Sequence, residues 1–311
     1  MSSEWRNLLE EHGYDGRIVA TGCLSDLSAG IAGPRRRGEL DARVYQRYMA
    51  GFSFQPPESL PAAQSLIVVA VPQPQVQVTF EFEGAALHSV VPPTYLRWQQ
   101  VDRQVGDLLV QALQPRGYRL AEASVPKKLL AVRSGLAAYG RNNIAYVPGM
   151  GSFHRLVAFY SDLPSEEDSW REPQMMQTCD KCTACLRRCP SGAITSDRFL
   201  LHAERCITFH NEKDSAHPFP QWLDPSWHNW LVGCMHCQLV CPENREVAHW
   251  VEQGPVFTQN ETALVLEGIA PDRLPAETAR KLLQFDMFDI YEVLARNLRL
   301  LTENAAHRRP E

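Results

Sequence analysis

Hydrophobic and polar positions in the first half of the chain predict strands and helices in mixed order. The continuous apolar run Ser65–Val71 is rich in β-branched residues and ends at a proline, which is typical of a buried strand. Apolar and polar residues alternate over Val76–Phe82, as they do in a half-buried strand. Between Trp98 and Ala112 the apolar residues recur at helical spacing and form one face. We therefore expect an α/β domain over residues 1–165.

Shorter segments complete the prediction. They are helices at 5–11 and 127–134, strands at 17–21, 144–147 and 155–160, a tight turn at 148–151, and a solvated loop at Arg35-Arg36-Arg37. The acidic, irregular stretch 161–173 is expected to be a linker. A cysteine-rich domain over 174–250 and a short helical tail over 255–311 follow it. The predicted fold class is α+β, with these three parts in order.

Composition places the chain among ordinary globular proteins. Of its 311 residues, 44% are hydrophobic and 22% are charged, which excludes a mostly disordered chain. The net charge of -5 excludes an overall basic footprint for nucleic acid. The apolar runs are far shorter than the roughly 20 residues of a spanning helix, and the first residues lack a secretory pattern. We expect a cytoplasmic protein without membrane contact, in which clustered cysteines bind metal rather than form disulfides.

Eight of the nine cysteines lie between residues 179 and 241, and their spacing predicts two iron–sulfur clusters. The first run has the form C-x2-C-x2-C-x3-C-P, in which three cysteines bind one [4Fe–4S] cluster and the fourth binds another. The predicted ligand sets are Cys179, Cys182, Cys185 and Cys241 for one cluster, and Cys189, Cys206, Cys234 and Cys237 for the other. Two tetrahedral zinc sites are the alternative. The remaining Cys23 is expected to be a small buried hydrophobic residue.

The segments around these cysteines resemble the epoxyqueuosine reductase family, which is itself similar to the reductive dehalogenases. They read ERCITF at 204–209, GCMHCQ at 233–238 and VCPEN at 240–244. Upstream, Ser134–Asn143 resembles the family's Ala-Gly-Leu-Gly-Trp-x-Gly-Lys-Asn-Thr stretch, and Pro148 with Gly151-Ser152-Phe153 resembles its next landmark. The resemblance covers roughly residues 60–245.

This resemblance implies a nitroreductase-like α/β domain that holds base-off cobalamin, and a ferredoxin-like domain whose two clusters reduce it. An external donor such as a ferredoxin or flavodoxin would supply the electrons, while cobalamin carries the difficult chemistry. The expected cobalamin-binding residues are Asn142, Gly149, Met150, Gly151 and Ser152. Small residues in this turn would let the backbone approach a flat macrocycle. A plain hairpin between two strands is the alternative.

The chain departs from the family pattern in three respects, one of which is a helix after Pro126 that is about two residues shorter. Ala123 stands where the family has the aspartate proposed to donate a proton, and the family's tRNA-reading helical repeats are expected to be missing or cut to a short tail. Tyr139 beside Arg141 is a candidate proton donor, because a nearby cation lowers the pKa of a phenol. A tyrosine that only packs and an arginine that only pairs with a carboxylate are the alternative. Further candidates are Glu122, Tyr95 and Tyr146.

Three functions remain open on these grounds. The first is a cobalamin-dependent reductase that acts on a small molecule or a modified nucleoside. The second is epoxyqueuosine reduction on tRNA, with salt-sensitive binding by a basic face. The residues of that face would be Arg116, Arg119, Lys127, Lys128 and Arg133. The third is a cobalamin-free protein that transfers electrons or handles corrinoids.

Overall fold

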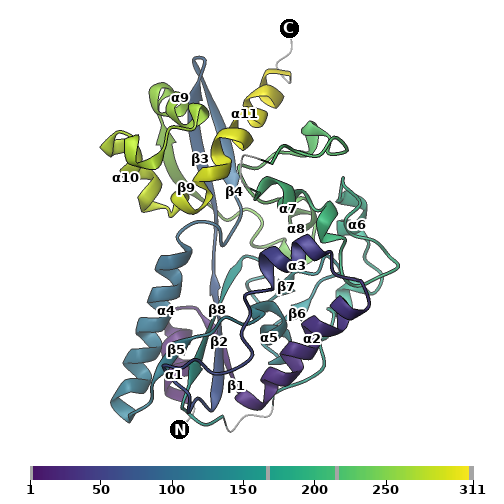
Figure 1. The fold of residues 1–311 in the computed structure, drawn as a ribbon, viewed down its shortest axis with the longest axis vertical. Helices are drawn as coiled ribbons and strands as arrows, with labels where there is room; N and C mark the ends of the chain where they lie inside the picture. Colours follow the sequence, from purple (N-terminus) through teal and green to yellow (C-terminus); the bar gives the residue numbers. More distant parts are fainter. Residues whose placement is uncertain (1–2, 166–168, 214–216, 308–311) are drawn as a thin grey trace.

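The computed structural model describes residues 3–165, 169–213 and 217–307. Three parts are visible in Figure 1: an α/β body, a segment of short helices that carries the cysteines, and a unit in which three strands pack with the last helices. Among the helices of the described residues, none combines the length and the apolar composition needed to cross a bilayer.

A four-stranded sheet forms the centre of the body. Its strands, in spatial order, are β1 (Asp15–Ala20), β2 (Ser65–Pro72), β8 (His154–Ser161) and β5 (Leu120–Glu122). All neighbouring strands run antiparallel. The strand β2 lies between β1 and β8 and is buried along its length. Its burial on both faces explains why its sequence is one continuous apolar run.

Two helices cover each face of this sheet. They are α1 (Ser3–Glu11) and α4 (Trp98–Leu113) on one face, and α2 (Leu24–Arg36) and α5 (Lys127–Arg133) on the other. Neighbouring residues of β2 serve opposite faces, since side chains alternate along a strand. Ile67 packs in the core with α1 and α4, and Leu66 packs in the core with α2 and α5.

The helix α2 corrects one expectation from the sequence. Arg35 and Arg36 occupy its last turn, where a solvated loop was predicted. The sequence is misleading here because α2 contains Pro34, and its helical state depends on burial of Leu24 and Leu27 in the body core. Tertiary packing of an apolar face therefore outweighs the local breaker signal.

A hairpin leaves the body and joins the C-terminal segment. It consists of β3 (Gln75–Phe82) and β4 (Ala85–Val91), and β3 pairs in parallel with β9 (Val251–Phe257). The helices α9 (Gln259–Glu267), α10 (Ala276–Gln284) and α11 (Tyr291–His307) pack with this sheet. The rings of Phe80 and Phe257 stack with centroids 5.1 Å apart. Residues 75–91 thus share a core with the tail, and the tail also contributes a strand, so these contacts cross the expected boundaries at 1–165 and 255–311.

The cysteine segment is built from short helices. They are η3 (Gln177–Cys179), α6 (Ala184–Arg188), η4 (Ala203–Arg205), α7 (Ile207–Asn211), η5 (Pro225–Trp227), α8 (His236–Leu239) and η6 (Pro242–Asn244). Two short strands of the body, β6 (Ala138–Tyr139) and β7 (Ala145–Tyr146), lie next to it, and Tyr139 bridges to Met175. Single 3-10 turns occur at η1 (Thr21–Cys23), η2 (Gln114–Arg116), η7 (Pro271–Arg273) and η8 (Met287–Ile290).

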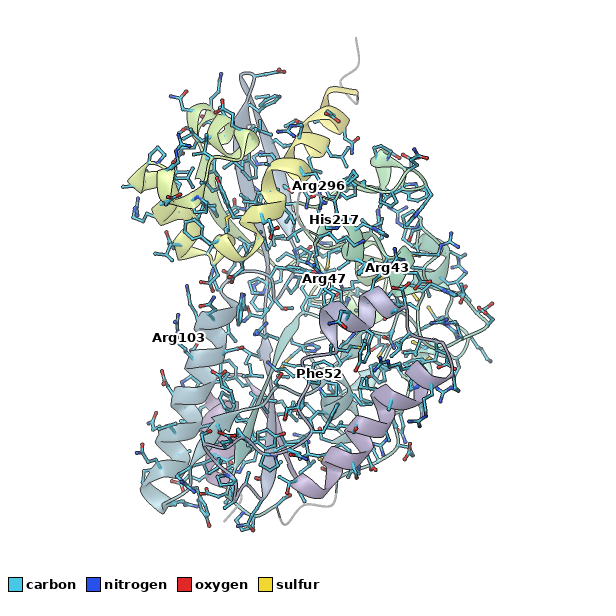
Figure 2. The ribbon with its side chains drawn as sticks, viewed as in Figure 1. Arg43, Arg47, Phe52, Arg103, His217 and Arg296 are labelled. Atoms are coloured by element: carbon cyan, nitrogen blue, oxygen red, sulfur yellow. The ribbon has the colours of Figure 1, made fainter. Side chains whose placement is uncertain are left out.

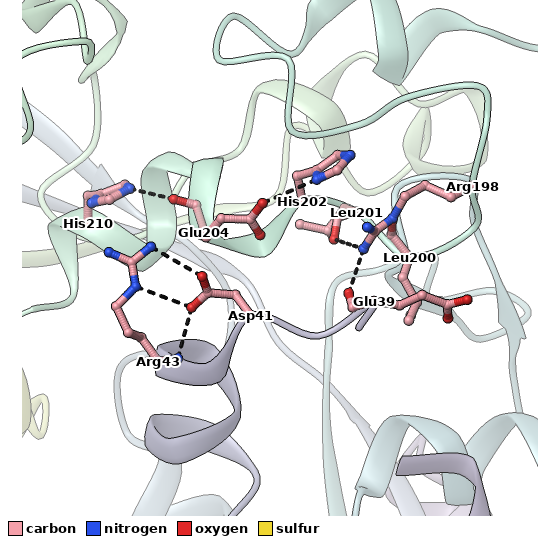
Figure 3. Close-up of polar contacts among 9 residues, drawn as sticks. All are labelled: Glu39, Asp41, Arg43, Arg198, Leu200, Leu201, His202, Glu204 and His210. Carbon is pink, nitrogen blue, oxygen red and sulfur yellow. Dashed lines mark hydrogen bonds and ion pairs between the residues drawn. The ribbon is translucent and has the colours of Figure 1, made fainter. Parts of the chain in front are cut away.

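The helix α3 (Ala42–Tyr48) attaches the body to this segment. Asp41 caps the helix by accepting hydrogen bonds from the N–H groups of Arg43 and Val44. Next to it, the guanidinium of Arg198 donates to the carbonyl of Glu39 over 2.7 Å (Figure 3). The loop before α3 is thereby held on the cysteine segment.

Candidate redox site

The four thiols predicted for one cluster come together in the structure. Burial raises the pKa of Cys179, and the nearby thiols of Cys241 and Cys182 raise it further. The same causes, with Cys179 added, raise the pKa of Cys185. Thiols must be close neighbours to influence one another in this way. We call Cys179, Cys182, Cys185 and Cys241 the first thiol group.

The other four predicted ligands form the second thiol group, Cys189, Cys206, Cys234 and Cys237. Burial raises the pKa of Cys234 to about 12, with further increases from Cys206 and Cys189. Burial also raises the pKa of Cys237, followed by the influence of Cys234. Cys185 of the first group also acts on Cys237, so the two groups are adjacent. The assignment of four cysteines to each cluster stays a prediction from their spacing.

A single metal ion and a cluster place different demands on four thiols. A zinc ion draws four thiolates to about 2.3 Å from one centre. A [4Fe–4S] cube distributes its four thiolates over four irons and so holds them farther apart. Within the described ranges, no three His, Cys, Asp or Glu side chains are placed to hold a single metal ion.

Arg141 lies at the first thiol group. Its main-chain N–H donates to Sγ of Cys179 over 3.4 Å. Its guanidinium donates to the carbonyls of Cys179 over 2.6 Å and Cys182 over 3.0 Å. These contacts fix the loop that carries two predicted ligands. The structure therefore gives no support to Arg141 as the cation that activates Tyr139, because its donors are directed to the cysteine loop.

The turn predicted to hold cobalamin packs against the cysteine segment. Ser152 donates from its main-chain N–H to Oδ1 of Asn244 over 2.8 Å and from its hydroxyl to Oε1 of Gln238 over 2.7 Å. Gly151 has a φ of +56°, and a Cβ there would overlap Oδ1 of Asn244. The sequence suggested that small residues in this turn let the backbone approach a macrocycle. In the structure, Gly151 lets the backbone approach the side chain of Asn244, which lies shortly after Cys241.

Two cavities lie between the body and the cysteine segment. The larger has a volume of about 1650 Å3 and is lined by residues of α2, β5, α5 and β8. The smaller, of about 640 Å3, is lined by α3, by the 92–95 segment and by all four members of the second thiol group. The cavities share a wall that includes Tyr48, Phe52 and Lys128, and Phe52 is labelled in Figure 2.

Besides the four cysteines of the second thiol group, five predicted site residues line these cavities, with Tyr95 in the smaller one. Glu122 and Tyr139 line the larger cavity, together with Ala123 at the position where a carboxylate was expected. Asn142 and Ser152 line the smaller one. The other predicted cobalamin residues, Gly149, Met150 and Gly151, line neither cavity, because the turn faces the cysteine segment and Met150 packs on the core of the body.

Tyr146 lies between the body and the thiols. Its hydroxyl accepts a hydrogen bond from Nδ2 of Asn142 over 2.9 Å. Burial raises the pKa of this phenol, and the neighbouring Cys241 raises it further. The proposed proton donor Tyr146 is therefore a neighbour of the first thiol group.

The five cations of the expected basic face have different surroundings in the structure. Arg116 and Arg119 are paired with Glu4 and Asp162, and Arg133 is buried between Asp26 and Glu172. Lys127 and Lys128 line both cavities, and burial lowers the pKa of each ammonium group. These five cations are therefore neutralised by pairing or directed inward.

A carboxyl group unforeseen in the sequence lies in the wall of the smaller cavity. Glu212 accepts a hydrogen bond from the hydroxyl of Tyr48 over 2.7 Å and another from the hydroxyl of Tyr95. Burial raises the pKa of this carboxyl, although both hydrogen bonds act in the opposite direction. The sequence offered only one signal for this site, which was Tyr95 among the further proton-donor candidates.

The C-terminal helix reaches the second thiol group through buried amides. Nδ2 of Asn297 donates to the carbonyls of Asn211 over 2.8 Å and Leu231 over 2.9 Å. Asn211 in turn accepts from the N–H of Gly233 over 3.0 Å and donates to its carbonyl over 2.6 Å. The segment after Cys206 and the segment before Cys234 are thus joined by α11.

Comparison with known proteins agrees with this site. Residues 178–244 match the family described as the 4Fe-4S double cluster binding domain. Epoxyqueuosine reductase from Aliivibrio fischeri is 32% identical over 146 residues, which is 46% of this chain and 38% of that protein. This part of the chain is similar to the epoxyqueuosine reductases. The match spans well under half the length of that relative.

Solved epoxyqueuosine reductases share the fold over nearly the whole chain. The enzyme from Streptococcus thermophilus has a TM-score of 0.68 at 16% identity, covering 99% of this chain and 82% of that one. An epoxyqueuosine reductase crystallised with a tRNA-Tyr epoxyqueuosine-modified stem loop has a TM-score of 0.67 at 21% identity, covering 97% of this chain and 80% of that one. The resemblance seen in the cysteine motifs therefore extends to the architecture.

Proposed function

We propose that the protein is a cobalamin-dependent iron–sulfur reductase that acts on an epoxide-bearing modified nucleoside in tRNA. One observation carries the proposal: all four members of the second thiol group line the cavity between the cysteine segment and the body. A cluster held there would pass electrons into an enclosed space. The names of the relatives, one of them crystallised with a modified tRNA stem loop, favour this substrate over the free small molecule that the sequence suggested first.

The residues present fit both cofactors. The two thiol groups would hold the [4Fe–4S] clusters, with the first group nearer the peptide loop clamped by Arg141. The larger cavity exceeds the roughly 300–1,000 Å3 typical of drug-sized ligands, as a corrinoid requires. Lys128 lines both cavities, whereas Asn142 and Ser152 line only the smaller one. Cobalamin, when bound, supplies a strongly reducing metal centre for breaking a carbon–oxygen bond.

The chain itself contributes electron supply, enclosure and proton donors. The external donor would be a one-electron carrier such as a ferredoxin or flavodoxin. Tyr139 and Glu122 remain candidate proton donors on the larger cavity, and burial raises the pKa of Tyr139, so its phenol keeps its proton. Its ring stands edge-on to Phe199 with centroids 5.2 Å apart, which limits its rotation.

The proposal is tested by loading and turnover under anaerobic conditions. Protein supplied with cobalamin should contain about eight iron atoms and one cobalt per chain. With a reduced flavodoxin it should convert epoxyqueuosine in tRNA at low salt. Iron without cobalt would instead support a cobalamin-free electron carrier, and zinc in place of iron would refute the mechanism. Turnover of the free nucleoside but not of tRNA would return the substrate to the small-molecule class.

A further inference from the structure

Tyr48, Glu212 and Tyr95 form a continuous hydrogen-bonded chain in the wall of the smaller cavity. We propose that this chain is a proton relay that delivers a proton to the group reduced beside the second thiol group. The proposal rests on the reductase function above and adds the path by which the reaction receives protons.

The three residues come from distant parts of the sequence. Tyr48 ends α3, Tyr95 lies in the segment between β4 and α4, and Glu212 directly follows α7. Each oxygen of the Glu212 carboxyl accepts a hydrogen bond from one tyrosine hydroxyl, so the carboxyl connects the two tyrosines. All three line the cavity that also receives the four thiols of the second group. The relay and the electron source therefore open into the same space.

The two ends of the relay differ in access. Tyr48 is 40% exposed and lines both cavities, so it is the more exposed end of the relay, although burial raises the pKa of its phenol. Tyr95 lies at the inner end, where burial also raises the pKa of the phenol. A phenol that gives up its proton as a general acid needs a neighbouring group to return one. Glu212 is positioned to do so.

The inner end is held firmly. Thr94 and Arg97, on either side of Tyr95, both have left-handed backbone conformations, with φ of 75° and 58°. Such strain persists only where the surroundings determine the conformation, and it is frequent at functional sites. A Cβ at Gly233 would lie 3.0 Å from the Tyr95 ring, so the ring rests directly on the backbone beside Cys234.

The charge environment of Glu212 is also defined. The guanidinium of Arg47 on α3 donates to its main-chain carbonyl, and Arg296 on α11 donates to the carbonyl of the preceding Asn211 over 3.1 Å (Figure 2). Both arginines hold the backbone of the segment. Burial remains the largest influence on the carboxyl and favours its protonated form.

The chemistry balances with the reductant named above. Reduction of an epoxide consumes two electrons and two protons, whether the oxygen leaves as water or remains as an alcohol. Two one-electron transfers from the reduced carrier protein supply the electrons through the clusters. Tyr95 gives a proton to the oxygen freed by carbon–oxygen cleavage, Glu212 returns one to Tyr95, and Tyr48 passes one from water to Glu212. A second passage through the relay supplies the second proton.

The closing experiment combines infrared spectroscopy of the purified protein with turnover. Variants Glu212→Gln, Tyr95→Phe and Tyr48→Phe are compared with Tyr45→Phe, a matched change on α3 at a residue whose ring packs with Arg35. The protein at neutral pH should show the carbonyl stretch of a protonated carboxylic acid. That band should shift in D2O, disappear in Glu212→Gln and move in Tyr95→Phe, while Tyr45→Phe leaves it unchanged. These readouts require neither substrate nor cobalamin.

In turnover, Tyr95→Phe and Glu212→Gln should lower kcat by about 100-fold or more with little change in KM. Reduction of the clusters by the donor protein should be unchanged in both. Absence of the infrared band, or full turnover in Tyr95→Phe, overturns the relay. Failure of the unmodified protein to reduce tRNA would count against the proposed function alone, since the infrared result still decides whether the carboxyl is a protonated member of the chain.

Discussion

The two thiol groups have similar ligands but different surroundings. The first is clamped by the main chain and guanidinium of Arg141 and borders the hairpin turn at Ser152 through Asn244. The second opens into the smaller cavity and is completed by contacts from α11. The first group thus has a protein environment on its sides, whereas the second faces space for a cofactor or substrate. Under the proposed function, the first group would hold the cluster that receives electrons and the second the cluster that delivers them.

The largest expected effect comes from removing one thiol in each group. Cys234→Ser should lower iron from about eight to about four atoms per chain and abolish substrate reduction. Cys182→Ser should remove the other cluster and leave the second one detectable by electron paramagnetic resonance. Loss of all iron in both variants would show that the groups do not assemble independently, and the comparison would fail.

A residue of the smaller cavity, which the second thiol group lines, should also affect how the free energy of unfolding depends on pH. His154 lines the smaller cavity, and burial lowers its pKa to about 4, well below the roughly 6.5 of an unfolded histidine. Between pH 4 and pH 6.5, the histidine is protonated in the unfolded state but neutral in the folded state. The contribution of His154 to the free energy of unfolding is therefore complete above pH 6.5 and is lost as the pH falls toward 4. The free energy of unfolding should fall by about 3 kcal/mol over that interval.

Urea unfolding at several pH values checks this expectation. His154→Gln should flatten the slope of stability against pH, whereas His249→Gln, at an exposed position, should leave it as it is. An unaltered slope in His154→Gln would show that His154 does not cause the pH dependence of the free energy of unfolding.

A smaller effect is expected from the link between α11 and the second group. Asn297→Leu leaves the carbonyls of Asn211 and Leu231 without their buried donor, which should cost about 2 kcal/mol of unfolding free energy. The second cluster should also lose iron to a chelator faster than the first. Asn304→Ala, which removes contacts to the carbonyls of Pro225 and His228, is the control at the same helix. Equal effects of the two variants would argue against a specific role for Asn297.

The smallest effect should follow Arg141→Gln. The guanidinium contacts to the carbonyls of Cys179 and Cys182 are lost, which should cost about 1 kcal/mol, while the main-chain N–H to Cys179 remains. The midpoint potential of the first cluster should shift and that of the second should stay constant in a redox titration followed by electron paramagnetic resonance. Arg187→Gln on α6 serves as a control for the loss of charge alone.

The sequence predicted those features that are encoded locally. The strand β2 and the amphipathic helix α4 follow from residue periodicity, and the cysteine sets were predicted from a spacing typical of ferredoxin modules with two clusters. Cys23 is buried in the body core, as expected for a small apolar side chain, and burial raises its thiol pKa to about 12. Each of these signals lies within a few residues of the feature that it predicts.

Features that depend on distant contacts could not be predicted in this way. The hairpin of β3 and β4 appeared to belong to the body, because its pairing with β9 joins residues far apart in sequence. The sequence did not single out Glu212, because the two tyrosines that contact its carboxyl group come from α3 and the 92–95 segment, which are distant in the chain. Arg141 seemed to serve Tyr139 because they are close in sequence, but the fold directs its side chain to the cysteine loop.

The bridge made by Asn297 has a consequence for the timing of assembly during synthesis. The ribosome releases the cysteine segment before it makes α11, so the second thiol group is exposed for a period without the amide that joins its two halves. Iron inserted at that stage would meet a loose set of thiols, open to oxidation. The contacts that join the two halves of the second thiol group therefore form only after α11 has been made and has docked.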